Sequence, residues 1–325
     1  MPRVADLAEL VRAPAALSVP GDVVAGAAAA GALGPRTPAL AAASVLLYWA
    51  GMAANDWADR ELDAVERPER PIPSGRVSPG LAVGLAAGLT AAGVGLAAAA
   101  GGRRATAVAL PLAAAVWGYD LAAKNTAVGP AMMATCRGLD VLLGAAGGRT
   151  ARALPAAVTV AAHTWTVTAL SRREVSGTDC ALPLRTLAGT ALVAASAAVP
   201  PGRRLTASVT RTGGPAEPAW RAPAVRTDGR RTVDVGNGRR ALGTVAVALP
   251  AVLAAWYAAR YGTAQARVAA EPTAARVRAA VGAGITGLPA LQGALTARAG
   301  SGLLGLAVAA AAPLGRRLAR KVSPT

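Results

Sequence analysis

The sequence predicts an all-α, multi-pass integral membrane protein. Hydrophobic residues make up 54% of its 325 residues, which is more than the core of a water-soluble domain of this size needs. They gather in blocks of about 20 residues, the length at which an α-helix crosses the hydrocarbon layer of a bilayer. Most charged residues lie between these blocks. The pattern therefore favours membrane-spanning helices over a soluble helical bundle.

Nine blocks are long and apolar enough to be candidate spans. They cover residues 14–33, 38–57, 79–101, 105–123, 127–148, 153–171, 183–200, 241–262 and 300–317. A tenth stretch, 279–296, is interrupted by glycines and by Pro289. Either this stretch is a span that merges with 300–317, or one of the weaker candidates is wrong.

The basic residues predict an orientation and argue against one class of partner. The formal charge of +17 could suggest nucleic acid, but no nucleic-acid-binding motif accompanies it. A cytoplasmic N-terminus would place most short-loop basic residues in the cytoplasm, at 58–78, 124–126, 172–185 and 260–278. The basic tail at 316–321 opposes this orientation. We expect a multi-pass protein of the cell membrane with no nucleic-acid partner.

Residues 201–240 form a long segment with almost no apolar periodicity. The segment is rich in Arg, Gly, Thr and Pro, a composition typical of flexible loops. We therefore expect one domain over residues 1–325, with this segment as an extramembrane loop inserted between spans.

The most informative polar residues follow the second apolar block. If the helix continues, Asp56, Asp59 and Asp63 lie within about 60° of one another around its axis, so three carboxylates share one face. Such a face needs a cation. Nearby arginines could supply ion pairs, or the carboxylates could hold Mg²⁺ together with a phosphorylated substrate. Ionisable groups at a membrane helix end are functional candidates by default, which favours the second interpretation.

The run NDWADRELD at residues 55–63, followed by RPERP at 67–71, resembles the first aspartate-rich motif of the UbiA superfamily of intramembrane prenyltransferases. The resemblance implies about nine helices around a central cavity and Mg²⁺ as cofactor. It also implies transfer of an isoprenyl group from an isoprenyl diphosphate to a small aromatic or lipidic acceptor. By this resemblance the metal ligands are Asp56, Asp59 and Asp63, and the substrate contacts are Asn55, Arg67 and Arg70.

A second polar group closes the fourth apolar block. Asp120 and Lys124 are four residues apart and share a helical face at the level of Asp56. A local ion pair would explain them without any function. Alternatively, Lys124 meets diphosphate oxygens as a point charge. The Tyr-x-x-x-x-Lys element that begins at Tyr119 is similar to one in UbiA enzymes, which makes Lys124 a catalytic candidate and Tyr119 and Asp120 substrate contacts.

Two charged residues lie three apart inside the fifth block, where unpaired charges are costly. One interpretation is a structural pair between Arg137 and Asp140. The other is that Arg137 reaches the diphosphate as a catalytic group, while Asp140 lines the acceptor cavity. The single histidine, His163, lies inside the sixth block and is more often a helix-to-helix hydrogen-bonding group than a catalyst; if functional, it would face the cavity as a base or acceptor contact.

The second aspartate-rich motif expected by this resemblance is altered. Residues 171–183 read SRREVSGTDCALP, and alignment of the Leu-Pro pair puts Glu174 on one expected aspartate position as a metal ligand. Serine or arginine replaces the others, and Arg172 and Arg173 could neutralise a diphosphate directly. Such a degenerate motif resembles the EboC-like branch of the superfamily.

Together these residues predict a Mg²⁺-dependent prenyltransferase whose partners are an isoprenyl diphosphate, an acceptor and the lipid bilayer. The alternative is a catalytically weak or inactive relative that binds a polyprenyl lipid and assists synthesis or export of a lipid-linked metabolite. The altered second motif favours this alternative, and the intact first motif favours the enzyme. No pattern specifies an oligomeric state.

Overall fold

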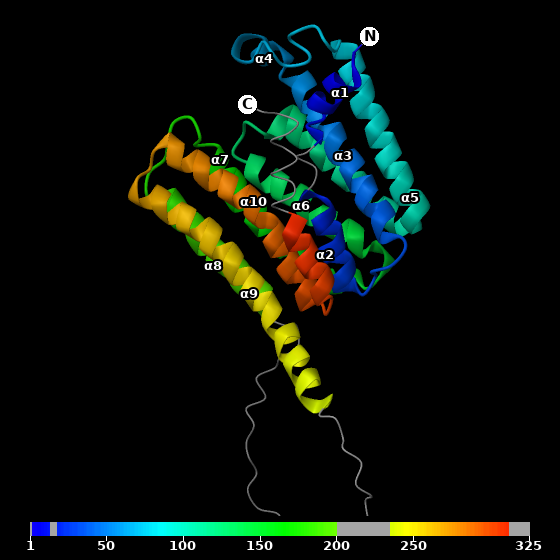
Figure 1. The fold of residues 1–325 in the computed structure, drawn as a ribbon. Coiled ribbons are helices and arrows are strands. Elements are labelled where there is room, and N and C mark those ends of the chain that lie inside the picture. The colour runs from blue at the N-terminus through cyan, green and yellow to red at the C-terminus, as the bar shows by residue number, and fades with distance from the viewer. Residues whose placement is uncertain (1, 14–17, 200–234, 312–325) are drawn as a thin grey trace, which may run out of the picture.

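The computed structural model describes residues 2–13, 18–199 and 235–311, and these ranges contain helices and no strand (Figure 1). The all-α prediction is confirmed. Two short helices, α1 and α4, lie together at one end of the molecule (Figure 1). In chain order the elements are α1 (Val4–Leu10), α2 (Pro20–Ala30), α3 (Thr37–Ala58), α4 (Arg60–Glu66), α5 (Pro79–Gly118), the π-helical turn η2 (Tyr119–Ala123), α6 (Gly129–Gly144), the 3₁₀ turn η3 (Ala145–Gly147), α7 (Thr150–Ser171), α8 (Ala181–Ala198), α9 (Val235–Ala270), α10 (Ala274–Arg298) and a last helix at Gly302–Ala311.

Helix α5 folds back on itself at Gly102, which has φ 62° and ψ −155°. The indole nitrogen of Trp117 donates a hydrogen bond of 3.0 Å to the hydroxyl of Thr90, 27 residues earlier. In a straight helix these residues would lie about 40 Å apart. The two arms of α5 therefore run antiparallel, and they correspond to the two apolar blocks predicted at 79–101 and 105–123.

A second reversal separates α10 from the helix at Gly302–Ala311. Gly300 adopts a positive φ of 96° at the turn. Beyond it, the two helices touch backbone to backbone, since a Cβ added at Gly293 would lie 2.4 Å from the carbonyl oxygen of Gly305. Residues 279–296 thus belong to one continuous helix, and the following helix is separate. The idea that the two stretches merge into one span is wrong.

Four helices in the described part of the chain are long and apolar enough to cross a bilayer. They are Thr37–Ala58, Pro79–Ala123, Thr150–Ser171 and Ala181–Ala198. These helices support an integral membrane protein, and the count of nine spans stays a prediction. Of the predicted loop at 201–240, residues 201–234 lie outside the described residues, and 235–240 belong to α9.

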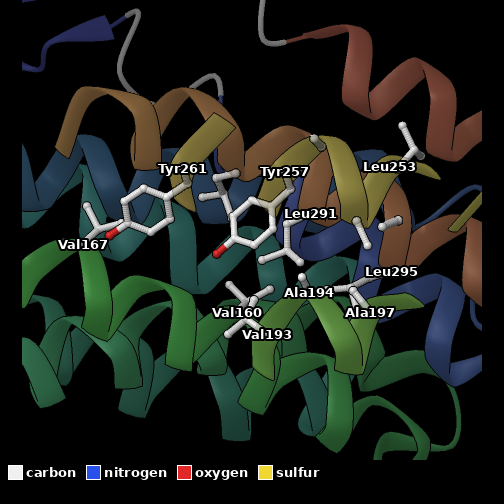
Figure 2. Packing of buried hydrophobic residues seen from close by; sticks show 14 of the residues in the cluster. Val160, Val167, Val193, Ala194, Ala197, Leu253, Tyr257, Tyr261, Leu291 and Leu295 are labelled. Atoms are coloured by element: carbon white, nitrogen blue, oxygen red, sulfur yellow. The ribbon is translucent and has the colours of Figure 1, made fainter. Parts of the chain in front are cut away.

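Small side chains dominate the interior, and the largest buried ones come from α9. Tyr257 and Tyr261 are fully buried between α9 and its neighbours α7, α8 and α10 (Figure 2). Val160 and Val193 pack near Tyr257 from α7 and α8, and Leu291 approaches from α10 (Figure 2). Small residues allow membrane helices to approach closely, so van der Waals contact stabilises such a bundle.

Candidate active site

The first acidic motif lies where α3 gives way to α4. Helix α3 ends at Ala58, Asp59 has φ −89° and ψ 2°, and α4 begins at Arg60. The helix therefore does not continue unbroken, as the shared-face argument assumed. Backbone bonds from Asp59 to Asn55 and from Asp63 to Asp59 nevertheless keep the break short.

Asp56 and Asp63 still converge, because one cation joins them. The Arg70 Nη1 atom lies 2.5 Å from a carboxylate oxygen of Asp63 and 3.4 Å from one of Asp56. Both acids are buried, with exposed fractions of 4% for Asp56 and 2% for Asp63. Buried carboxylates need such partners, since removing an unpaired charge from water is costly.

Asp59 points to a different cation. The Lys124 Nζ atom lies 2.6 Å from an oxygen of Asp59 and 3.2 Å from the side-chain oxygen of Asn55. The ion pair of Lys124 is therefore with Asp59 and not with Asp120, as the spacing had suggested. In the described residues no three His, Cys, Asp or Glu side chains gather as a metal-binding group. The unbroken helix assumed for the shared face is absent here, and the assignment of Asp56, Asp59 and Asp63 as metal ligands stays a prediction.

The proline-rich loop, residues 67–78 between α4 and α5, covers the buried acids. Arg70 reaches in from this loop, and Arg67 lies 3.8 Å from Asp63 with a more exposed side chain. The loop is fastened by Arg76, which bonds Asp6 at 2.9 Å and Glu9 at 2.6 Å on α1. These bonds raise the pKa of Arg76, and hydrogen bonds from Arg3 and then Arg76 lower the pKa of Asp6 to about 2. The link between α1 and the loop is therefore charged at neutral pH.

Arg12 belongs to this cluster, although the sequence argument did not include it. Its guanidinium lies 2.6 Å from Asp56 Oδ1, the same oxygen that faces Arg70, and 3.5 Å from the sulfur of Met52. Nothing in its spacing relates it to the motif, because 44 residues separate it from Asp56. Only the docking of α1 brings it there.

The π-helical turn at Tyr119–Ala123 places two predicted substrate contacts. Such turns inside α-helices are frequent at functional sites. Asp120 is buried against α3, where a Cβ added at Gly51 would lie 3.1 Å from its carboxylate oxygen. Tyr119 lines the cavity described below. The turn also brings Lys124 to the break between α3 and α4.

Arg137 and Asp140 do not pair with each other. Arg137 forms an ion pair of 2.7 Å with Asp22 on α2, and Asp140 accepts a hydrogen bond from Ser44 on α3. Gln292 on α10 donates a hydrogen bond of 2.6 Å to Asp22. The mutual pair is therefore wrong, and its physical reason is that each charge finds a partner on another helix.

A cavity of about 290 Å³ joins these polar groups. Met52 and Tyr119 line it near the acidic cluster. Its other walls are mainly apolar and include Tyr48, Arg137, His163, Val167, Ile285 and Leu288. His163 Nδ1 lies 2.8 Å from the hydroxyl of Tyr257, so the histidine also links α7 to α9.

The altered second motif lies at the edge of this arrangement. Arg172 donates a hydrogen bond to the carbonyl of Thr126, just beyond Lys124, and Arg173 is exposed. Glu174 is held through its backbone carbonyl, which accepts a bond of 2.8 Å from Arg278. Partial burial raises the pKa of Glu174, and the positive charge of Arg278 offsets part of this rise. A role of Glu174 as a metal ligand stays a prediction.

The donor set at the α3–α4 break fits Mg²⁺ in its chemistry. Hard oxygen ligands suit this ion, which commonly uses one or two carboxylates and completes its shell with water and phosphate oxygens. Asp56 and Asp63 meet that requirement, since a single Arg70 nitrogen contacts both. Their convergence on one cationic atom is the observation that supports the fit.

Fold and cluster together define an all-helical membrane protein with a charged site at one end of an internal cavity. Residues 18–175, just under half of the chain, match the UbiA prenyltransferase family. This stretch contains every candidate site residue that the sequence predicted.

Curated relatives match over short stretches. Digeranylgeranylglyceryl phosphate synthase of Natronomonas pharaonis is 47% identical over 81 residues, which are 24% of this chain and 29% of that protein. The synthase of the same name from Methanothrix thermoacetophila is 60% identical over 45 residues, 14% of this chain and 17% of that protein. The bacteriochlorophyll synthase 33 kDa chain of Rhodobacter capsulatus is 69% identical over 29 residues, 9% of each chain. The chain thus spans less than a third of the length of these relatives.

Solved structures show the same fold over most of the chain. One, described as digeranylgeranylglyceryl phosphate synthase in membranes, has a TM-score of 0.61 at 14% identity and covers 90% of this chain and 97% of its own. An apo UbiA homologue from Aeropyrum pernix K1 has a TM-score of 0.52 at 20% identity, with coverages of 83% and 96%. At these identities the likeness concerns the fold alone. The assignment to the EboC-like branch stays a prediction.

Proposed function

We propose that this protein is a membrane-embedded prenyltransferase of the cell membrane that uses an isoprenyl diphosphate as donor and depends on Mg²⁺. The observation that carries the proposal is the convergence of Asp56 and Asp63 beside Arg70 and Lys124. The match of residues 18–175 to the UbiA prenyltransferase family supports it. Carboxylates and cations in one buried cluster suit a ligand that brings both a metal and a negative charge.

The charges of the cluster indicate that metal and diphosphate bind together. Three carboxylates, Asp56, Asp59 and Asp63, face the cations Arg12, Arg67, Arg70 and Lys124, so every carboxylate has a partner without any ligand. A divalent cation alone would add positive charge to a cluster whose carboxylates are already neutralised. A diphosphate that enters with it supplies the compensating negative charge, and Arg70 and Lys124 can then turn from the carboxylates to the phosphate oxygens.

The chemistry proceeds by loss of diphosphate from the allylic carbon. When bound, Mg²⁺ would stabilise the charge that develops on the leaving diphosphate. Lys124 and Arg70 would add charge-assisted hydrogen bonds to the same oxygens. The resulting allylic cation must be kept from water until the acceptor attacks, and the largely apolar cavity beyond Met52 and Tyr119 provides that shelter.

The far part of the cavity suits the acceptor. Tyr48, Arg137 and His163 bring polar groups into a mainly apolar wall. Arg137 is already neutralised by Asp22 and His163 is hydrogen bonded by Tyr257, so both can orient an acceptor without presenting an unpaired charge. The product named for the archaeal relatives is an isoprenoid glyceryl phosphate, which favours a lipidic acceptor over an aromatic one.

A second function deserves a test, because each motif carboxylate already has a cation. A catalytically weak protein that binds a polyprenyl lipid would need no metal, and its ion pairs would simply hold the α3–α4 break together. The position of Glu174, whose side chain joins no acidic group of three in the described residues, favours this alternative. The intact carboxylate pair at Asp56 and Asp63 favours the enzyme.

Membranes that contain the protein or its Asp63→Asn variant separate the two functions. They are supplied with C15, C20 and longer isoprenyl diphosphates, a native lipid extract and Mg²⁺, and products are followed by mass spectrometry. We expect a prenylated lipid and released diphosphate from the wild type and at least about a hundredfold less from the variant. Glu61→Gln is the matched control, because Glu61 is exposed and its ion pair in the described residues is with Arg60. If no donor gives a product with folded protein, the lipid-binding function is favoured.

A further inference from the structure

Arg12 has an unusual backbone and an unusual partner. In the part of the chain that the structure describes, it is the one residue other than glycine with a positive φ, at 45°. This backbone conformation is disfavoured for residues other than Gly, Asn and Asp, so surrounding contacts must hold it. The Arg12 guanidinium forms an ion pair with Asp56, one of the two carboxylates that converge.

The contacts that hold Arg12 come from α1. Leu10 is fully buried and Val11 nearly so, in a cluster that also contains Ile72 and Val77 of the proline-rich loop. Two acids of α1, the buried Asp6 and the exposed Glu9, are bonded to Arg76. Apolar contacts and ion pairs thus both attach α1 to the loop that covers the site. This attachment holds Arg12 in its strained backbone conformation.

Arg12 also competes for the atom that a metal would need. Asp56 Oδ1 faces both Arg12 at 2.6 Å and Arg70 at 3.4 Å, so a cation that binds this oxygen has to displace a guanidinium. Arg70 stays paired with Asp63 at 2.5 Å and its side chain is 20% exposed, whereas the side chain of Arg12 is 37% exposed. Arg12 is therefore the guanidinium that can move into solvent or to an anion when a metal takes this oxygen.

We propose that Arg12 occupies the metal position on Asp56 in the substrate-free protein and moves to the diphosphate when metal and donor bind. Helix α1, which directly precedes Arg12 and positions it, is called the N-terminal strap. This inference rests on the proposed function. It adds that Arg12 suppresses binding of Mg²⁺ alone and strengthens binding of diphosphate with Mg²⁺. Metal occupancy is thereby coupled to the presence of the donor.

The test measures binding and not turnover. Purified full-length protein in detergent is titrated with Mn²⁺, a paramagnetic substitute for Mg²⁺, and bound ion is followed by electron paramagnetic resonance with and without inorganic diphosphate. Without diphosphate, Arg12→Gln should bind Mn²⁺ about tenfold more tightly than wild type, a coupling of ordinary size. With diphosphate present, the variant should bind the anion about tenfold more weakly.

Two further variants make the result specific. Arg60→Gln removes a cation from the same stretch, and it should leave both affinities unchanged. In the described residues Arg60 forms its ion pair with the exposed Glu61, and its other contacts are with Trp57. Arg76→Gln keeps every site residue but releases α1, so it should raise Mn²⁺ affinity in the same direction and speed hydrogen exchange in residues 4–12. This variant also keeps the test decisive if Arg12→Gln does not fold.

Specific outcomes would overturn the inference. Equal Mn²⁺ affinity in wild type, Arg12→Gln and Arg76→Gln would show that Arg12 does not hold the metal position. Tighter Mn²⁺ binding with unchanged diphosphate affinity would contradict the transfer of Arg12 to the anion. If the Mn²⁺ and diphosphate results are as expected but no prenylated product forms from any donor, the proposed function fails and the exchange of counter-ions stands.

Discussion

At the scale of single residues, the buried acids depend on which cation reaches them and how deeply. Arg70 bridges Asp56 and Asp63 with a side chain that is 20% exposed, whereas Arg67 approaches Asp63 only to 3.8 Å and is 51% exposed. Two arginines of the same loop and of the same chemistry therefore differ in how strongly they stabilise the buried acids. Sequence alone presents them as equivalent members of one motif.

This difference gives the first prediction at the residue scale. Arg70→Gln removes the cation shared by two buried carboxylates and should lower the free energy of unfolding by about 3 kcal/mol. Arg67→Gln removes an exposed, distant charge and should cost less than about 1 kcal/mol. Denaturant unfolding of the purified proteins in detergent compares them. Equal losses would show that burial of the Arg70 bridge does not stabilise the folded state.

The residues of the site were predictable to different degrees. The first motif was recognisable from the sequence, because its acids and arginines lie close together along the chain. The partners of Lys124 and Arg137 were not predictable, because spacing of three or four residues indicates a shared helical face but says nothing about neighbouring helices. Asp59 and Asp22, which belong to other elements, form the ion pairs with these cations instead. Arg12 was missed for the same reason.

At the scale of elements, glycine decides where helices reverse. Apolar blocks predicted both arms of α5, but their antiparallel arrangement depends on Gly102, whose φ of 62° and ψ of −155° belong to a region that is essentially restricted to glycine. The break at Asp59 is different, because its backbone is open to any residue. No composition signal marks that break, and the sequence argument therefore extended the helix through it.

Gly102→Ala tests the element-scale argument. The substitution should lower the free energy of unfolding by about 1–3 kcal/mol, since a Cβ strains the reversal even though no neighbouring atom opposes it. Gly95→Ala is the matched control: this glycine lies inside the same helix, also without a neighbour within 4 Å, and alanine there should be neutral or stabilising by up to about 1 kcal/mol. Thermal unfolding in detergent separates the two. A neutral Gly102→Ala would contradict the reversal at this residue.

At the scale of the whole molecule, the site lies at one end of the helix bundle, and the positive-inside pattern predicts which side of the membrane that end faces. The loops around 58–78 and 172–185 carry the site and many of the short-loop basic residues. The N-terminal strap joins the same end, because α1 is bonded to Arg76. With this predicted orientation, the proposed diphosphate site opens to the cytoplasm, where a water-soluble leaving group can depart.

The two cysteines allow this orientation to be measured without adding a label site. Cys180 is exposed beside the altered second motif, and Cys136 is buried inside α6. A membrane-impermeant maleimide should therefore leave Cys180 unmodified in intact cells and modify it once the membrane is opened. Cys180→Ser should abolish the labelling, while Cys136→Ala should not change it. Labelling of Cys180 in intact cells would place the site outside, and the basic tail at 316–321 would then be the better guide to topology than the short loops.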